Sequence, residues 1–447
     1  MAKEREQWRS RVGFVFAAAG SAVGLGNIWR FPTAAGLNGG GAFVLVYLIL
    51  IFVIGIPLMM VELTLGRRTK RSVIGAFKVL KQGSPWWLVG ALGVISGFVI
   101  LSFYSVIAGW CLAYVVSYAT GQFSGLSPGG IEDQFLALVS NPVIPVLWHA
   151  LFMAMTIGVV ILGVAKGIER WSKILMPILL VLLVVLAVRS VTLEGASEGL
   201  YWLLRPDFTR LDFLTILGAL GQVFFSLSLG MGAMLTYGSY LSKKENIPGS
   251  AAYIALTDVG IALLAGLIII PAVFAFGLDP DTGPPLIFIT LPAVFQSIPL
   301  GNFFGLMFFL LISIAALTSA ISLLEVVVAW SIDELGWQRR RSTILSGLAI
   351  FLLGIPSSLS EGVWADFQII GLNILSFADS LTANLLLPLG GLLTTIFVGW
   401  VWGAKKAVGE LEESGDSFAF GGVWSVLVKY VMPLILIYIL YTGLFPG

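Results

Sequence analysis

The chain has 447 residues, of which 58% are hydrophobic and 11% are charged, with a mean hydropathy of +0.98 and a net charge of +1. These values lie outside the range of soluble globular proteins and indicate a polytopic membrane protein. The near-neutral charge gives no attraction to nucleic acid, and a single Cys (Cys111) and a single His (His149) exclude an internal disulfide and a Cys/His zinc cluster.

Runs of about 20 apolar residues predict transmembrane helices, and the chain contains eleven such runs. They begin near Val12, Phe43, Trp86, Val143, Trp171, Phe213, Ala251, Phe303, Thr343, Ile374 and Val423. Lys and Arg mark the cytoplasmic side of a membrane protein, and 20 of the 25 fall on the side of the N-terminus. We therefore predict an integral plasma (inner) membrane protein with a cytoplasmic N-terminus. Because the number of spans is odd, the C-terminus is expected outside.

The first 20 residues, MAKEREQWRSRVGFVFAAAG, also resemble a signal peptide, with a charged start, an apolar run and small residues. The apolar pattern continues past the Ala run, and cleavage there would remove the first span. We therefore interpret this segment as the start of a transmembrane helix.

The first span is interrupted by GSAVGLGNIWRFP, residues 20–32, which places three glycines, an Asn and an Arg in an apolar helix. Span six carries a matching interruption, SLSLGMG, at residues 226–232. Backbone polar groups in lipid must be paired, so a broken helix is tolerated only where it lines a cavity or meets a ligand. The alternative for the first break is a GxxxG packing motif of Gly20 and Gly24, which leaves Asn27 and Arg30 unexplained.

Two breaks at matching positions of two halves with opposite topology are typical of transporters and predict a binding site near the bilayer midplane. The chain is therefore predicted to be one all-α transporter domain (1–447) with eleven transmembrane helices. Spans one to five (12–190) and six to ten (213–402) would form a 5+5 inverted repeat with broken helices 1 and 6. Span eleven (423–445) would be an additional helix.

The motif GSAVGLGNIWRFP, followed by NGGGAFVLVYLILIFVIGIPLMMVELTLGR, resembles the opening signature of the neurotransmitter:sodium symporter family. The resemblance extends to FFSLSLGMGAMLTYGSY in span six and AALTSAISLLE in span eight, and so covers nearly the whole chain. Within the prokaryotic, leucine-transporter-like branch with eleven spans, the chain is similar to transporters of hydrophobic and aromatic amino acids. The resemblance implies sodium-coupled symport by alternating access, with no organic cofactor.

The resemblance further implies two Na+ sites, built from the oxygen ligands that this hard cation prefers. The site that touches the substrate (Na1) matches Ala22, Asn27, Ser226 and a residue of span seven, for which Asp258 is favoured and Thr257 is one position away. The other site (Na2) matches the carbonyls of Gly20, Val23 and Ala315 and the hydroxyls of Thr318 and Ser319.

Each of these ligand assignments has a structural alternative. Ser and Thr in membrane helices also bond their own i−4 carbonyl, and Asp258 would alternatively be a packing group or a proton relay. Animal members of the family need chloride near Na1, so an anionic Asp258 leads us to expect chloride independence.

By the same resemblance, the half-helix N-terminus at Leu25 and Gly26, together with the Tyr104 hydroxyl, would hold a substrate carboxylate. The full set of expected substrate contacts is Ala22, Val23, Gly24, Leu25, Gly26, Ile100, Tyr104, Phe225, Leu227, Ser228, Met231, Ser319 and Leu323. The flexible Met231 favours a broad range of substrates, covering Leu, Trp, Phe, Tyr, Ile, Val and Met. The structural alternative is that the apolar members only pack.

Gates are expected at both ends of the pathway. Outside, Arg30 would pair with Asp379; inside, Arg5 would pair with Asp333, and Trp8 and Tyr240 would close around them.

In span five, Gly167 and Pro177 enclose nine residues. Because Pro removes a helix hydrogen bond, this segment is a candidate hinge that unwinds to admit water to the inner Na+.

Other function classes fit the sequence less well. A membrane enzyme would need a nucleophile and a base, and His149 has no evident partner. A channel would need a symmetric pore, whereas two broken helices indicate an occluded site. The remaining alternative is a proton-coupled or osmolyte-carrying transporter of the same fold. Apart from the lipid bilayer and the amino acid substrate, the sequence predicts no partner and no oligomeric state.

Overall fold

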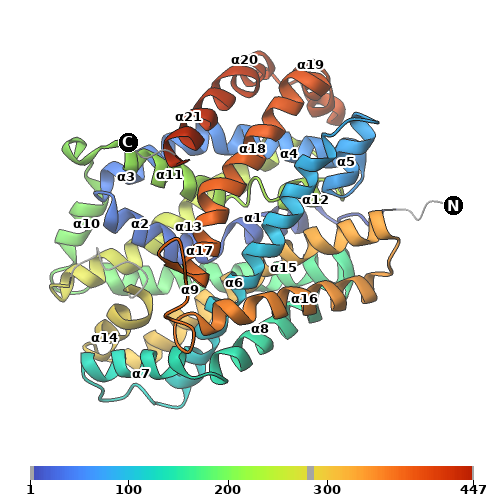
Figure 1. The fold of residues 1–447 in the computed structure, drawn as a ribbon. Helices are drawn as coiled ribbons and strands as arrows, with labels where there is room; N and C mark the ends of the chain where they lie inside the picture. Colours follow the sequence, from blue (N-terminus) through green and yellow to red (C-terminus); the bar gives the residue numbers. More distant parts are fainter. Residues whose placement is uncertain (1–4, 279–285, 445–447) are drawn as a thin grey trace.

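The structure is a computed structural model that describes residues 5–278 and 286–444 (Figure 1). The first half contains α1 (Arg11–Ala22), η1 (Gly26–Arg30), α2 (Phe31–Leu37), α3 (Gly41–Leu50), η2 (Ile51–Gly55), α4 (Ile56–Thr69), α5 (Val73–Leu80), α6 (Trp87–Ala119), α7 (Pro128–Ser140), α8 (Ile144–Val160), η3 (Val164–Ile168), α9 (Glu169–Val191) and α10 (Ala196–Leu204).

In the described part of the second half, the elements other than helices are one short antiparallel hairpin, β1 (Gln368–Ile369) with β2 (Leu372–Asn373). Its helices are η4 (Phe208–Arg210), α11 (Phe213–Ser226), α12 (Ala233–Gly238), α13 (Ile247–Ala275), η5 (Leu286–Thr290), α14 (Leu291–Gln296), α15 (Gly301–Leu335), α16 (Arg339–Leu359), α17 (Ile374–Leu381), η6 (Thr382–Leu386), α18 (Leu387–Ile396), η7 (Phe397–Gly403), α19 (Ala404–Leu411), η8 (Glu412–Ser414), α20 (Gly421–Val426), η9 (Leu427–Val431) and α21 (Met432–Leu444).

Within the described residues, eight helices are long and apolar enough to cross a membrane, and two bent helix pairs raise this number to ten. The bent pairs are α1 with η1 and α2, at 48°, and α7 with α8, at 75°. The sixth predicted span is divided into the shorter helices α11 and α12. The predicted all-α membrane fold is therefore confirmed, and the helices are consistent with eleven spans.

Both predicted breaks are present. After α1, Val23 is extended (φ −78°, ψ 101°), and the chain becomes helical again from Leu25. After α11, Ser228, Gly230 and Gly232 all have positive φ. Glycine adopts this left-handed conformation at little cost, which explains the Gly-Met-Gly sequence at the second break.

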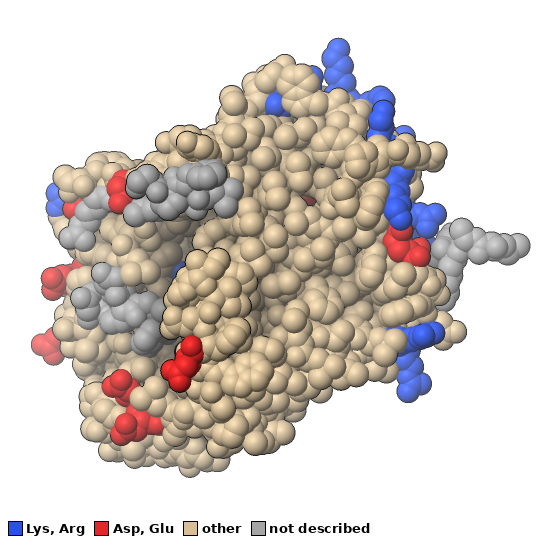
Figure 2. Space-filling view, in the orientation of Figure 1, with Lys and Arg blue, Asp and Glu red and all other residues tan. Residues whose placement is uncertain are grey.

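The long helix α15 packs against α6, α8, α9 and α16, and α1 packs against α9, α13 and α15. Of these helices, α15 and α6 are the most deeply buried of the candidate spans in the described residues. The N-terminus, α5 and α19 lie at one end, and α7, α10 and α14 lie at the other (Figure 1). Figure 2 shows Lys and Arg mainly at the N-terminal end and Asp and Glu mainly at the opposite end.

Candidate functional site

A small cavity of about 20 Å³ lies between the two breaks. Its lining residues are Ser21, Ala22, Gly24, Gly26, Ile100, Tyr104, Phe225, Ser228, Met231, Ser319 and Leu323. All of these except Ser21 were expected substrate contacts. Three other expected contacts, Val23, Leu25 and Leu227, are buried beside the cavity without lining it.

One end of the cavity is polar. The Leu25 N–H donates a hydrogen bond to the Tyr104 hydroxyl (3.1 Å), at the start of the second half-helix. A Cβ atom at Gly24 would lie 2.6 Å from the Tyr104 hydroxyl oxygen, and one at Gly26 would lie 2.9 Å from the Phe225 ring. A Cβ atom at either glycine would therefore displace a side chain at this wall of the cavity.

The other end of the cavity is apolar and is formed by Ile100, Phe225, Met231 and Leu323. Ile100, Met231 and Leu323 are each at most 3% exposed. A zwitterion with an apolar side chain fits this division into a polar and an apolar end.

Asp258 on α13 is fully buried beside the cavity and accepts three side-chain hydrogen bonds. Ser226 Oγ (2.6 Å) and Tyr47 Oη (3.0 Å) donate to Oδ2, and Asn27 Nδ2 (2.7 Å) donates to Oδ1. A buried charge needs such partners. Thr257 lies on another face of α13 and donates to the Tyr253 carbonyl instead, so it is Asp258 that meets Asn27 and Ser226.

A second cluster of oxygen atoms joins the first break to α15. Thr318 Oγ1 lies 3.5 Å from the Val23 carbonyl oxygen and 2.9 Å from that of Ala315. Ser319 Oγ lies 3.4 Å from the Gly20 oxygen and 3.3 Å from the Val23 oxygen. The five groups expected at Na2 are thus adjacent.

Apart from the Asn27 amide nitrogen, both clusters consist of oxygen atoms, which suit a hard cation such as Na+ better than a transition metal. Across residues 5–278 and 286–444, no group of three or more His, Cys, Asp or Glu side chains could hold a metal ion. The residues present therefore fit an alkali cation.

Ion pairs lie on both sides of the cavity, where the two gates are expected. On one side, Arg30 binds Asp379 (2.9 Å), and its guanidinium lies 5.0 Å from the centre of the Phe225 ring. On the other side, Arg5 binds Asp333 and lies 4.9 Å from the centre of the Tyr240 ring.

Trp8 adds contacts on the same side of the cavity as Arg5 and Asp333. Its indole N–H donates to the Tyr237 carbonyl (3.0 Å), and its ring lies 6.0 Å from the ring of Tyr240. All the residues expected at the two gates are therefore brought together in pairs or clusters.

The model of the family described as "Sodium:neurotransmitter symporter family" matches residues 5–125 and 144–446. The chain belongs to this family. Members are sodium-coupled transporters rather than enzymes, so the chain is an integral membrane transporter.

Similar proteins cover almost the whole chain. It is 45% identical over 432 residues to "Uncharacterized sodium-dependent transporter YhdH" of Bacillus subtilis, covering 96% of each chain. It is 39% identical to an uncharacterized sodium-dependent transporter of Haemophilus influenzae, covering 99% of each. The crystal structure of MhsT in complex with L-phenylalanine superimposes with a TM-score of 0.93 at 48% identity, covering 98% of this chain and 100% of MhsT.

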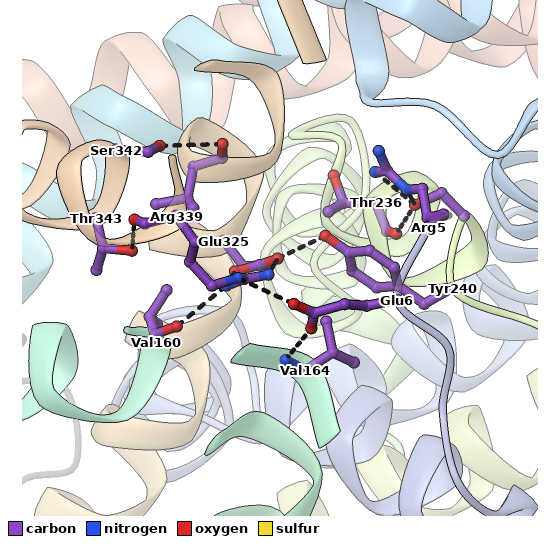
Figure 3. A network of polar contacts seen from close by, with 12 residues as sticks. Arg5, Glu6, Val160, Val164, Thr236, Tyr240, Glu325, Arg339, Ser342 and Thr343 are labelled. Carbon is purple, nitrogen blue, oxygen red and sulfur yellow. Dashed lines mark hydrogen bonds and ion pairs between the residues drawn. The ribbon is translucent and has the colours of Figure 1, made fainter. Parts of the chain in front are cut away.

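Sequence reasoning missed one network at the N-terminal end of this symporter (Figure 3). Glu325 is fully buried and accepts hydrogen bonds from Tyr240 (2.5 Å) and twice from Arg339 (2.8 Å each). Arg339 also contacts Glu6 (3.5 Å), which accepts from the Val164 N–H (2.7 Å). The sequence contained one signal of this network, Glu325 in the span-eight motif SLLE. An ionisable residue inside a span rarely lacks a partner.

The predicted hinge lies next to this network. Gly167 is in the π-helical turn η3, and Pro177 is inside α9. Between them, the buried Glu169 accepts hydrogen bonds from Arg9 N–H (2.7 Å) and Ser10 Oγ (2.9 Å). The N-terminal segment is therefore bonded directly to the start of α9.

Proposed function

We propose that this symporter carries hydrophobic and aromatic L-amino acids into the cell together with two Na+ ions, by alternating access and without chloride. The observation that carries the proposal is the cavity between the two breaks, with one polar and one apolar end and an oxygen cluster on each side. The phenylalanine complex of the related MhsT supports a hydrophobic amino acid as substrate.

In this proposal, the substrate carboxylate takes the place of the Tyr104 hydroxyl as the acceptor for the Leu25 N–H, at a half-helix N-terminus that favours anions. Tyr104 then donates its own proton to the carboxylate. The substrate side chain contacts Ile100, Met231 and Leu323. Met231 adapts to side chains of different shape, which supports a range from Leu to Trp.

The two Na+ ions are assigned to the two oxygen clusters. Na1 is held by the Ala22 carbonyl and by Asn27, Ser226 and Asp258. Na2 is held by the carbonyls of Gly20, Val23 and Ala315 and the hydroxyls of Thr318 and Ser319. When bound, the ions supply positive charge next to the substrate carboxylate and join the first break to α13 and α15.

The Asp258 carboxylate supports chloride independence. Tyr47 and Ser226 already donate hydrogen bonds to it, so a fixed anion of the protein occupies these donors. Equal Na+-driven uptake after replacement of chloride by gluconate is expected, and strong stimulation by chloride would contradict this part of the proposal.

Two Na+ ions provide enough free energy for concentrative uptake. Moving one charge inward is worth about 2.3 kcal/mol per 100 mV, and a tenfold Na+ gradient adds about 1.4 kcal/mol. Two ions therefore supply on the order of 7 kcal/mol, which corresponds to about a 10⁵-fold gradient of a zwitterion.

The proposed topology places the N-terminus in the cytoplasm and the C-terminus outside. The concentration of Lys and Arg at the N-terminal end (Figure 2) supports this orientation. The proposal includes the inverted repeats 12–190 and 213–402, with 423–445 as the additional span.

Uptake of radiolabelled Trp and Leu into proteoliposomes tests the function. We expect uptake with an inward Na+ gradient and none with K+ or a pH gradient in its place. The Asn27→Ala variant should lose this uptake, because it lacks an Na1 ligand. Uptake that follows the pH gradient and ignores Na+ would refute sodium coupling and assign proton coupling to Asp258.

A further inference from the structure

An exposed hollow lies at the turn between α5 and α6, at the N-terminal end of the molecule. Its lining includes Lys78, Lys81, Gln82, Gly83, Ser84 and Trp87. It lies far along the chain from both breaks, and none of its residues lines the cavity described above.

The hollow presents hydrogen-bond donors and positive charge. Lys78 and Lys81 are exposed, and Lys81 makes no ion pair with the described residues. The backbone N–H groups of Gln82 and Gly83 have no hydrogen-bond partner in the part of the chain that the structure describes. Gly83 has φ +70°, and the space around it is open. Consecutive free N–H groups in a turn, next to ammonium groups, form an anion-binding concavity.

Apolar side chains border the same hollow. Trp87 is 40% exposed, and the neighbouring Val79 and Leu88 are 50% and 53% exposed. The turn directly precedes the membrane span Trp87–Ala119, so these side chains lie where Trp is enriched, at the boundary between headgroups and acyl chains. Cationic and apolar groups side by side match a molecule with a phosphate headgroup and a hydrocarbon tail.

We propose that this hollow binds the phosphate headgroup of an anionic phospholipid from the leaflet on the N-terminal side. Lys78, Lys81 and the two free N–H groups would hold the phosphate, and Trp87 would lie against the glycerol and the first acyl carbons. Charge complementarity favours an anionic over a zwitterionic lipid, because the hollow has two Lys side chains and one acidic neighbour, Glu334, bound to Lys78.

The bound lipid would act next to the inner gate. Lys78 is paired with Glu334, and the adjacent Asp333 accepts from the Ser72 N–H (2.6 Å) and binds Arg5. A phosphate competes with Glu334 for Lys78 and so weakens one of the two links between α5 and the end of α15. This inference does not depend on the proposed substrate.

Native mass spectrometry of the purified transporter, titrated with phosphatidylglycerol, phosphatidylcholine or inorganic phosphate, tests the proposal. We expect one phosphatidylglycerol to bind more tightly than phosphatidylcholine. The double variant Lys78→Gln/Lys81→Gln should bind it about 30-fold more weakly, since each Lys near an anionic lipid contributes about a factor of five. The matched control Lys405→Gln/Lys406→Gln, which removes two exposed Lys from α19, should bind normally.

The Glu334→Gln variant should change the affinity for phosphatidylglycerol in the opposite direction. It frees Lys78 from its carboxylate, so phosphatidylglycerol should bind more tightly than to the unaltered protein. If the double Lys variant fails to fold, the Glu334→Gln variant still tests whether the hollow binds the lipid. Equal binding of both lipids, an unchanged affinity in Glu334→Gln, or competition by inorganic phosphate at the same concentration as the lipid would overturn the proposal.

Discussion

Replacement of Asp258 by Asn should make Na+ binding depend on chloride. The carboxylate accepts from Ser226 at 2.6 Å, Asn27 at 2.7 Å and Tyr47 at 3.0 Å. Hydrogen bonds to a charged group are worth about 1.5–3 kcal/mol, against about 0.5–1.5 kcal/mol for neutral pairs. Because an Asn amide presents one oxygen where the carboxylate presents two, and carries no charge, we expect a loss of about 2 kcal/mol, or roughly 30-fold in apparent Na+ affinity without chloride.

Chloride should restore most of this loss, since Tyr47 and Ser226 can then donate to the ion. The assay is Na+-dependent binding of radiolabelled Leu in chloride and in gluconate, for the unaltered protein and for Asp258→Asn. Thr257→Ala is the matched control, because Thr257 bonds only within its own helix. An Asp258→Asn protein with normal Na+ affinity in gluconate would refute the reasoning.

Three further predictions follow from the same geometry. Thr318→Ala removes one expected Na2 ligand and should weaken Na+ activation of uptake by 1.5–3 kcal/mol, about 10- to 100-fold, in proteoliposomes. Gly24→Ala places a Cβ 2.6 Å from the Tyr104 hydroxyl and should weaken Leu binding by about 1–3 kcal/mol through overpacking, measured by scintillation proximity. Arg67→Ala leaves the buried Glu410 without its main partner and should lower stability by about 3–5 kcal/mol, measured by denaturation in detergent and relieved in part by a second change, Glu410→Ala.

The spans and the two breaks could be predicted because both depend on local chemistry. Apolar runs of a given length predict a span, and glycines together with polar residues inside such a run predict a break. The individual cavity residues, such as Ala22 and Asn27 at the first break and Thr318 and Ser319 in span eight, were assigned through the family resemblance. Ten of the eleven residues that line the cavity were expected.

The rest of the candidate site depends on contacts between side chains that lie far apart in the sequence, which no local sequence pattern predicts. Tyr47 meets Asp258 across 211 residues of sequence, and Arg5 meets Asp333 across 328. The resemblance supplied the second pair and not the first. The choice between Asp258 and Thr257 required knowing which face of the helix points toward Asn27 and Ser226. A shift of one residue rotates a side chain by about 100° around a helix.

The polar network at the N-terminal end connects the proposed hinge with the inner gate. Glu6 is bonded to Val164, in η3, and Ser10 is bonded to Glu169, at the first turn of α9. Unwinding between Gly167 and Pro177 would therefore carry away the partners of the N-terminal segment.

The same segment contains Arg5 and Trp8, which contact Asp333 and Tyr240 at the proposed inner gate. Tyr240 in turn donates to Glu325, and the Arg339 that binds Glu325 also contacts Glu6. Because these contacts form one closed circuit, we expect water entry at α9 and release of the proposed inner gate to be coupled. Loss of any one contact lowers the free energy needed to break the others. Such cooperativity allows a gate to be either closed or open.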